Sequence, residues 1–279
     1  LLIFIQFSKN TMENKASSSS KFGSMFAAIV IPATIVIAIL LFKFLLGDPA
    51  NFEGGDPDKG HPLNTLGTVY KGGMIVPILM AFFMMVLIFS IERFITIKFA
   101  YGKGALDKFV IKIKGLLDAK DLDAAFKECD LQKGAVGNVV YAVLSKYEHL
   151  ITEPGMNKDQ KIVALHKELE ESTSLELPML EKNLTIIATL ASIATLVGLI
   201  GTVLGMIKSF AGMASEGGGD SAVIALGISE ALINTALGIT TSTIAIIAYN
   251  YFTSEIDTLT YSIDEAGYSI TQNFAATQS

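Results

Sequence analysis

Four long apolar stretches constrain the fold of this 279-residue chain more than any other feature of its sequence. They cover residues 25–46, 74–97, 184–207 and 222–252. A helix needs about 20 consecutive, mostly apolar residues to cross the hydrocarbon core of a bilayer. Inside lipid, a single segment satisfies its own backbone polar groups only by forming a helix. The sequence therefore predicts an all-α, polytopic membrane protein with about four transmembrane helices.

The charged residues are gathered in one region. Only 17 % of the residues are charged and 51 % are hydrophobic, which is unusual for a soluble domain. Most of the charges lie between Glu92 and Lys182, so residues 98–183 are expected to form a polar insert. Residues 105–117 and 122–126 carry apolar side chains at helical spacing, and 157–175 has the pattern of a charged helix. We therefore expect a small helical bundle there, interrupted at Gly134 and Gly137.

The first apolar stretch has two interpretations, because Lys9, Lys15 and Lys21 precede it. It is either a signal peptide or a retained helix. We favour the retained helix, since its apolar run exceeds the usual 7–15 residues of a signal peptide and no A-x-A site follows. The chain begins with Leu and contains a serine run at 17–20, so we expect the natural start to be Met12.

Lys and Arg near the ends of the stretches predict the topology, because cytoplasmic loops are enriched in them. Residues 1–24 are basic and are expected inside, whereas the loop 47–73 is mostly acidic and is expected outside. Arg93, Lys98 and the lysines that follow place the insert in the cytoplasm. Residues 208–221, which include three consecutive glycines, then form an outer link. Counting spans returns the tail 253–279 to the cytoplasm.

One face of the third stretch carries only small and hydroxyl side chains. On a helix of 3.6 residues per turn this face consists of Ala191, Thr195, Gly198, Thr202, Gly205 and Ser209. Small residues four apart let helices approach closely, which favours a packing role for the glycines. We assign that role to Gly198, Gly201, Gly205, Gly227 and Gly238. The same face is also polar enough to line a path for ions.

The fourth stretch favours the path, because it contains one acidic residue, Glu230. A charged carboxylate in hydrocarbon costs about 2.5 kcal/mol or more, so Glu230 must face protein or water, or be protonated. The alternative is a fixed polar clamp between subunits. Together with Thr195 and Thr202, the predicted path comprises Glu230, Asn234, Thr235 and Thr241. One chain supplies too few titratable groups, so the deeper one is expected on a partner.

Several classes of function find no support in the sequence. A net charge of −6 gives no basic surface for nucleic acid. Cys129 is the single cysteine, and the three histidines at 61, 149 and 166 lack metal-ligand spacing. No catalytic set of nucleophile and base and no phosphate-binding loop occurs. We therefore expect neither an enzyme nor a protein with a metal or cofactor.

Two motifs resemble a known family. Residues 199–210 (LIGTVLGMIKSF) and 227–239 (GISEALINTALGI) look like the paired signatures of the MotA/TolQ/ExbB proton-channel family, with ExbB the closest resemblance. The resemblance is strong over about 184–256 and weaker over the second stretch and the insert. The order of short outer loop, long cytoplasmic insert and two final spans also agrees. The stretch 25–46 is an addition to the three-helix ExbB pattern.

The resemblance implies a ring of subunits, a homopentamer in most members, around a small single-span partner of the ExbD/TolR type whose membrane aspartate carries protons. By motif position, Thr202 and Thr235 resemble the channel-facing threonines and Glu230 the glutamate of the last helix. It implies a bacterial inner-membrane location, with periplasmic outer segments, and coupling to a TonB-type protein. The alternatives are a TolQ-like or motility-type stator, a non-conducting membrane scaffold and, with little support, a self-contained transporter.

Overall fold

The computed structural model describes residues 25–58, 60–215 and 221–277, and these residues are almost entirely helical. Four helical segments are long and apolar enough to cross a membrane, namely Met25–Leu46, Gly73–Asp118, Lys158–Gly212 and Ile224–Thr277. Within the described ranges there is no β-strand, only an isolated bridge between Phe52 and Pro62. The prediction of an all-α chain with four apolar helices is confirmed. The expected N-terminal segment 1–24, its start at Met12 and the glycines 217–219 lie outside the described residues.

The described chain divides into two compact units. The apolar unit contains residues 25–91 and Asn183–Asn250, and the polar unit contains Glu92–Lys182 and residues 251–277. This division follows the composition, because the charged insert forms most of one unit and the apolar stretches form the other.

The first helix, Met25–Leu46, belongs to the apolar unit and ends in a π-helical turn, η1 (Phe42–Leu46). Much of its apolar surface is exposed, including Ile29, Leu40 and Phe44. Its Phe26 ring packs edge-on against Phe89, with 6.0 Å between the ring centres. This helix therefore packs along one side and offers the rest of its apolar surface to lipid or another chain.

The loop after this helix is ordered by short helices: η2 (Pro49–Asn51), η3 (Glu53–Gly55), α2 (Thr65–Tyr70) and η4 (Gly73–Ile75). The buried Asn51 side chain donates to the carbonyl oxygens of Leu45 and Leu46, at 2.8 and 3.0 Å. Tyr70 stacks on Phe42 and contacts Phe52 edge-on. The loop is thus fastened back onto the end of the first helix.

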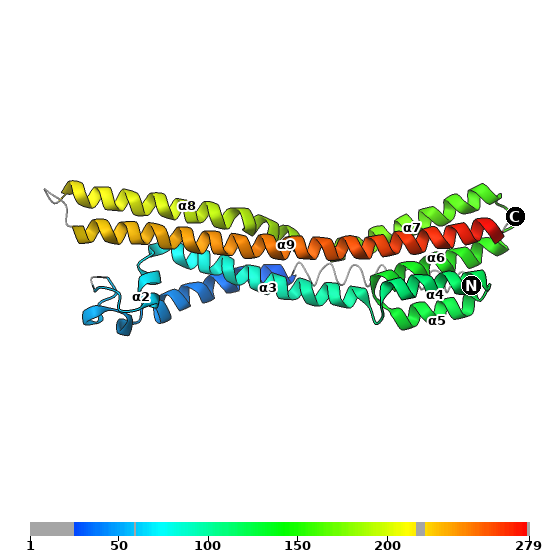
Figure 1. Ribbon diagram of the computed structural model, residues 1–279, viewed down its shortest axis with the longest axis horizontal. Helices are drawn as coiled ribbons and strands as arrows, with labels where there is room; N and C mark the ends of the chain where they lie inside the picture. The colour runs from blue at the N-terminus through cyan, green and yellow to red at the C-terminus, as the bar shows by residue number, and fades with distance from the viewer. Residues whose placement is uncertain (1–24, 59, 216–220, 278–279) are drawn as a thin grey trace. The chain divides into compact units, whose positions relative to one another are not determined.

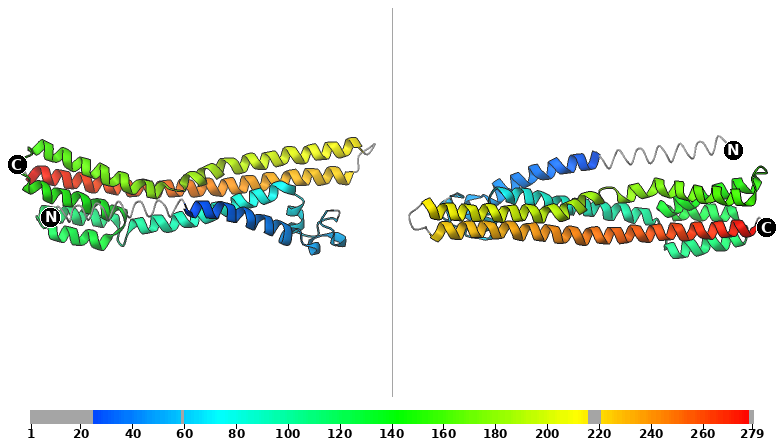
Figure 2. Two further views of the ribbon diagram at one scale, coloured as in Figure 1. Left: turned by 180° about the vertical axis from the view of Figure 1, so that it is seen from behind. Right: turned by 90° about the horizontal axis from the view of Figure 1, so that it is seen from above.

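Three long helices follow in the apolar stretches: α3 (Val76–Tyr101), α8 (Leu184–Ser215) and α9 (Ser221–Thr277). α8 and the first part of α9 lie side by side in both Figure 1 and Figure 2. α8 continues past the expected end at residue 207, and α9 continues through the expected tail. The tail is helical because its apolar residues recur at helical spacing and are buried in the polar unit: Ile256, Leu259, Ile263, Ala266, Ile270 and Phe274.

The polar unit contains the expected helices in the insert: α4 (Leu106–Asp118), α5 (Leu122–Gln132), α6 (Gly134–Thr152) and α7 (Lys158–Glu181). Asp121 caps α5 by accepting from the Ala124 amide, and Asn157 caps α7 within a capping box. Consecutive helices of the insert contact one another and form a bundle (Figure 1).

The expectation that Gly137 interrupts a helix is wrong. Gly134, with φ +72°, does separate α5 from α6 and is the first residue of α6. Gly137 lies inside α6, where a Cβ atom would be 3.2 Å from the Cys129 carbonyl oxygen. Its small size serves a close approach between α5 and α6, which a sequence pattern does not distinguish from a break.

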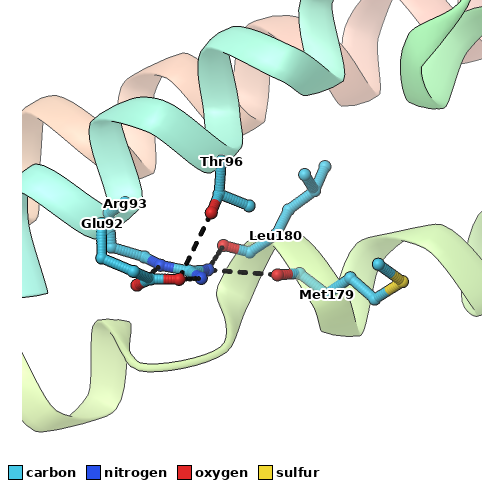
Figure 3. A network of polar contacts seen from close by, with 5 residues as sticks. All are labelled: Glu92, Arg93, Thr96, Met179 and Leu180. Carbon is cyan, nitrogen blue, oxygen red and sulfur yellow. Dashed lines mark hydrogen bonds and ion pairs between the residues drawn. The ribbon is translucent and has the colours of Figure 1, made fainter. Parts of the chain in front are cut away.

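A polar network joins α3 to the last turn of α7 within the polar unit (Figure 3). The Arg93 side chain is 3 % exposed, and its Nη1 donates to the carbonyl oxygens of Met179 and Leu180, both at 3.1 Å. Its Nε donates to Glu92 Oε2 at 2.7 Å, and Thr96 donates to Glu92 Oε1 at 3.3 Å. The last carbonyl groups of a helix lack intrahelical partners, so Arg93 caps the C-terminus of α7.

Candidate functional site

The contact between α8 and α9 is built on glycines. A Cβ atom on Gly198 would lie 2.9 Å from the Asn234 carbonyl oxygen, and one on Gly238 would lie 2.6 Å from that of Ala194. At the other end, Gly205 and Gly227 face each other, since a Cβ on either would lie 2.8 Å from the carbonyl oxygen of the other. All of these distances are shorter than a real Cβ tolerates. These two helices therefore approach backbone to backbone, as small residues permit.

Gly201 makes room for a side chain instead. A Cβ atom at this position would lie 2.5 Å from the Cβ of Asn234 and 2.8 Å from its Nδ2. All five glycines expected to pack the helices thus lie in the α8–α9 contact. This contact fixes the register of the two helices and the positions of the polar side chains between them.

Two threonine hydroxyls meet in the middle of the contact. Oγ1 of Thr202 on α8 is hydrogen-bonded to Oγ1 of Thr235 on α9. The Thr202 hydroxyl is also within hydrogen-bond distance of two carbonyl oxygens that it is able to donate to, that of Gly198 at 3.2 Å and that of Ala231 at 3.4 Å. Both threonines are half-buried in this chain. A hydroxyl both donates and accepts, so the pair is able to pass a hydrogen bond from one helix to the other.

Glu230 lies a little over one turn before Thr235 on α9. Its Oε2 accepts a hydrogen bond from Lys208 Nζ at 2.9 Å, forming an ion pair between α8 and α9. The Glu230 side chain is 12 % exposed, whereas that of Lys208 is 64 % exposed. On its other side the carboxylate lies against Gly73, where a Cβ would be 2.3 Å from Oε1. Gly73 has φ +76° and no side chain, so it accommodates the carboxylate.

Asn234 is 1 % exposed and joins α9 to the turn before α3. Its Nδ2 donates to the Gly72 carbonyl oxygen at 2.9 Å, while its buried Oδ1 has no hydrogen-bond partner among the described residues. The two glycines of this turn thus contact Asn234 and Glu230, which lie one turn apart on α9. The turn and the helix position each other.

The remaining residues of the predicted path are not gathered at this centre. Thr195 is exposed on α8. Thr241 is buried, and its hydroxyl donates to the Leu237 carbonyl one turn back, at 2.8 Å. Ser242, which was not in the predicted set, donates to the Ala191 carbonyl on α8. In this chain, therefore, Thr202, Glu230, Asn234 and Thr235 form the polar centre, and Thr241 lies further along α9.

A second lysine lies near the ion pair, in the turn before α3. Lys71 Nζ donates to the Asp58 carbonyl oxygen at 2.9 Å and lies 5.5 Å from the centre of the Phe52 ring. Burial lowers the pKa of Lys71, Asp58 and Asp56 oppose this effect, and the positive charge of Lys208 adds to it. Two lysines, Lys208 on α8 and Lys71 in the turn before α3, therefore lie near the Glu230 carboxylate of the antiparallel α8–α9 hairpin.

Sequence reasoning missed Lys208, Gly72, Gly73 and the Glu92–Arg93 pair. The sequence places Lys208 in the predicted link 208–221, although the antiparallel register of the two helices indicates its partner. If Thr202 faces Thr235, the residue six positions after Thr202 on α8 lies level with the residue five or six positions before Thr235 on α9. Lys208 is then level with Glu230. Glu92 lies inside the second predicted span, and its acidic side chain next to arginine was a sign of a buried polar contact.

Chemically, the centre offers a carboxylate, an ammonium group, a carboxamide and two linked hydroxyls. All of these groups form hydrogen bonds, and the carboxylate is also able to bind a proton. Among the described residues, no three His, Cys, Asp or Glu side chains are grouped as metal ligands. The surrounding faces of α8 and α9 expose large apolar side chains, including Leu199, Val203 and Leu232. The polar centre is thus a small group of buried and half-buried side chains beside exposed apolar ones.

Comparison with known proteins gives one family. Residues 132–265 match the model of the MotA/TolQ/ExbB proton channel family. The chain is 32 % identical over 158 residues to the Tol-Pal system protein TolQ of Pseudomonas aeruginosa, which covers 57 % of this chain and 68 % of that protein.

Two relatives named biopolymer transport protein ExbB match shorter regions. The protein of Helicobacter pylori is 44 % identical over 80 residues, covering 29 % of this chain and 55 % of the relative. The protein of Salmonella typhimurium is 40 % identical over 70 residues, covering 25 % and 29 %. The chain thus spans less than two thirds of the length of these two relatives.

Proposed function

This chain belongs to the MotA/TolQ/ExbB proton channel family, and from that premise we propose that it is an ExbB-like subunit of a proton-driven motor. As an ExbB/TolQ-type channel subunit it is a multi-pass protein of the inner membrane. In the proposal, several copies, five by the resemblance, form a ring around an ExbD/TolR-type single-span partner. The loop 47–73 lies in the periplasm, and the insert and both termini lie in the cytoplasm.

The observation that carries the proposal is the hydroxyl pair of Thr202 and Thr235 with Glu230 on the same helix. These groups lie within the residues that match the family model. The two threonines lie in the α8–α9 contact that glycines pack, and the Glu230 carboxylate lies against Gly73. Glu230 is nearest the outer end, so it receives protons from the periplasm in the proposed orientation. The hydroxyls then lead toward the titratable group of the partner. Proton flow through this seam would drive the TonB-type protein that energises outer-membrane transport.

The test is proton flux into liposomes that contain this chain and its single-span partner. We expect an imposed proton gradient to collapse faster with the complex than with the chain alone. Thr235→Val and Glu230→Gln should remove the flux while the complex still assembles. Thr243→Val is the matched control, because Thr243 is exposed on α9 and bonds only to its own helix, at Ile239. A complex that assembles but conducts no protons would identify a scaffold instead.

A TolQ-like role is the second candidate, because the match to TolQ is the longest of those reported above. The two branches are separated by complementation. The chain and its partner are expressed in a Salmonella typhimurium strain lacking ExbB and in a Pseudomonas aeruginosa strain lacking TolQ. Restored TonB-dependent uptake supports the ExbB-like role, and repair of the Tol-Pal defect alone supports the TolQ-like role.

A further inference from the structure

The ion pair between α8 and α9 places the Lys208 ammonium on the Glu230 carboxylate, which is the proposed proton carrier. Lys208 Nζ is 2.9 Å from Glu230 Oε2, and the other oxygen of the carboxylate faces Gly73. The Glu230 side chain is 12 % exposed, whereas that of Lys208 is 64 % exposed. The ion pair therefore joins a mostly buried carboxylate to a side chain that is largely in contact with solvent.

A carboxylate at the edge of hydrocarbon requires a counter-charge, and two are available to Glu230. One is the Lys208 ammonium, and the other is a proton. A protonated carboxyl group has no charge with which to hold the ammonium, so the two exclude each other. The contact of Asn234 with the Gly72–Gly73 turn holds α9 and this turn in place beside Glu230. The Lys208 ammonium, in contrast, is joined to α8 through a long, flexible side chain. Lys208 is thus the mobile part of the site.

We propose that Lys208 is a positioning residue that latches Glu230, and that its ammonium has to leave the carboxylate before Glu230 accepts a proton from the outer side. In that step a hydronium ion gives its proton to the carboxylate and becomes water. The ammonium keeps its own protons and turns to solvent. This inference rests on the proposed function and adds the residue that controls proton entry.

The other charges near this ion pair support Lys208, and not Lys71, as the residue that latches Glu230. Lys71 is held by the Asp58 carbonyl oxygen and lies over the Phe52 ring, and Asp56 and Asp58 act on its charge. Lys71 is therefore engaged with its own loop. It is also close enough for the charge of Lys208 to act on it, so it repels the Lys208 ammonium. Among the described residues, only Lys208 forms an ion pair with Glu230.

The experiment measures proton flux into liposomes containing the full chain with its single-span partner, using a pH-sensitive dye enclosed in the vesicles. Lys208→Gln removes the ammonium and should increase the flux roughly two- to fivefold, which corresponds to the strength of an exposed ion pair. Lys208→Arg keeps a cation and should restore the unmodified flux. Lys43→Gln, at an exposed lysine of the first helix with no ion pair among the described residues, should leave the flux unchanged.

The second arm asks whether Lys208 acts through Glu230. In a Glu230→Gln background the flux is at baseline, and Lys208→Gln should add nothing to it. An equal increase in that background, or no increase with Glu230 intact, would overturn the latch. A decrease that arginine rescues would also overturn it, because it would make the ammonium part of the conducting path. If Lys208→Gln lowers the melting temperature and abolishes the flux, and Lys208→Arg does not restore them, Lys208 has only a structural role and the latch is wrong.

The same vesicles separate the two proposals. If the unmodified complex conducts above the Glu230→Gln baseline while Lys208→Gln matches the unmodified flux, the proposed function stands and the latch is wrong. If the unmodified complex itself stays at the baseline, the proposed function fails, and the latch fails with it.

Discussion

The side-chain amide of Asn234 donates a hydrogen bond to the Gly72 carbonyl oxygen at 2.9 Å, although 162 positions separate the two residues in the chain. The bond fastens α9 to the turn that precedes α3. The next residue of that turn, Gly73, faces Glu230, one turn from Asn234 on α9. The position of the candidate proton carrier therefore depends on a contact that brings the second and fourth apolar stretches together.

Replacing Asn234 by alanine should destabilise the apolar unit by about 1–2 kcal/mol. The Gly72 carbonyl loses its donor, and a buried polar group without a partner is costly, although hydrogen bonds between membrane helices are on average modest. Unfolding in mixed detergent, followed by circular dichroism, measures the change. Asn250→Ala, at an exposed position further along α9, is the control and should change stability by less than about 0.5 kcal/mol. Equal effects of the two substitutions would contradict a stabilising role for the hydrogen bond between Asn234 and Gly72.

Substituting alanine at two glycines should have opposite effects. At Gly238 a Cβ would lie 2.6 Å from the Ala194 carbonyl oxygen, so the methyl group should force α8 and α9 apart at a cost of about 1–3 kcal/mol. At Gly115, in α4, nothing lies within 4 Å of the added Cβ, and alanine should stabilise the chain by about 0.5–1 kcal/mol. Melting temperatures of the two variants check both signs. A tolerated Gly238→Ala would show that the backbones do not approach this closely.

Arg93→Met should loosen the end of α7. It removes the guanidinium group from the carbonyl oxygens of Met179 and Leu180, and hydrogen bonds to a charged group contribute about 1.5–3 kcal/mol. The local consequence is faster cleavage by trypsin after Lys182, the residue that follows α7, because proteolysis reports local opening. Lys98→Met, at an exposed position on α3, should leave the cleavage rate unchanged. Unchanged cleavage in Arg93→Met would rule out the cap.

Cys129 should react slowly with thiol reagents in the folded protein. It is 3 % exposed, and burial, reinforced by Asp130 and Glu128, raises the pKa of its thiol to about 12. At pH 8 the reactive thiolate is therefore scarce, and alkylation by iodoacetamide should accelerate strongly in denaturant.

The raised pKa of the Cys129 thiol also makes the free energy of unfolding depend on pH. The folded chain holds the thiol proton more tightly than the unfolded chain, whose thiol has the ordinary pKa of 9.0. This contribution to stability is complete below pH 9 and is lost as the pH rises from 9 toward 12. A denaturation series across that range, compared with Cys129→Ala, measures it. Rapid alkylation of the folded chain at pH 8 would contradict both expectations.

Sequence patterns predicted much of the fold because hydrophobic length and period are local properties. The four apolar helices and the helical insert follow from spacings along one segment. Similar spacings predicted that glycines such as Gly198 and Gly238 pack the helices, and both lie where α8 and α9 approach each other. The helical tail was not predicted, because residues 253–277 carry many polar groups and show their apolar face only when Ile256, Leu259 and Ile263 are seen buried. Gly137 was misjudged for a related reason, since a break and a close approach both favour glycine.

By itself, the sequence determined that this chain has four apolar helices long enough to cross a membrane, and that the last two carry hydroxyl groups and one carboxylate. These features can be recognised in each segment separately, because exposing backbone polar groups or a charge to lipid is costly whatever the rest of the chain does. The tertiary structure decided which groups come together. Lys208 meets Glu230, and Asn234 meets Gly72, only because closely packed glycine faces set the register of α8 on α9 and the turn before α3 closes over them. Side-chain partnerships of this kind depend on distances of a few ångströms between segments far apart in the chain, and such distances exist only in the packed molecule.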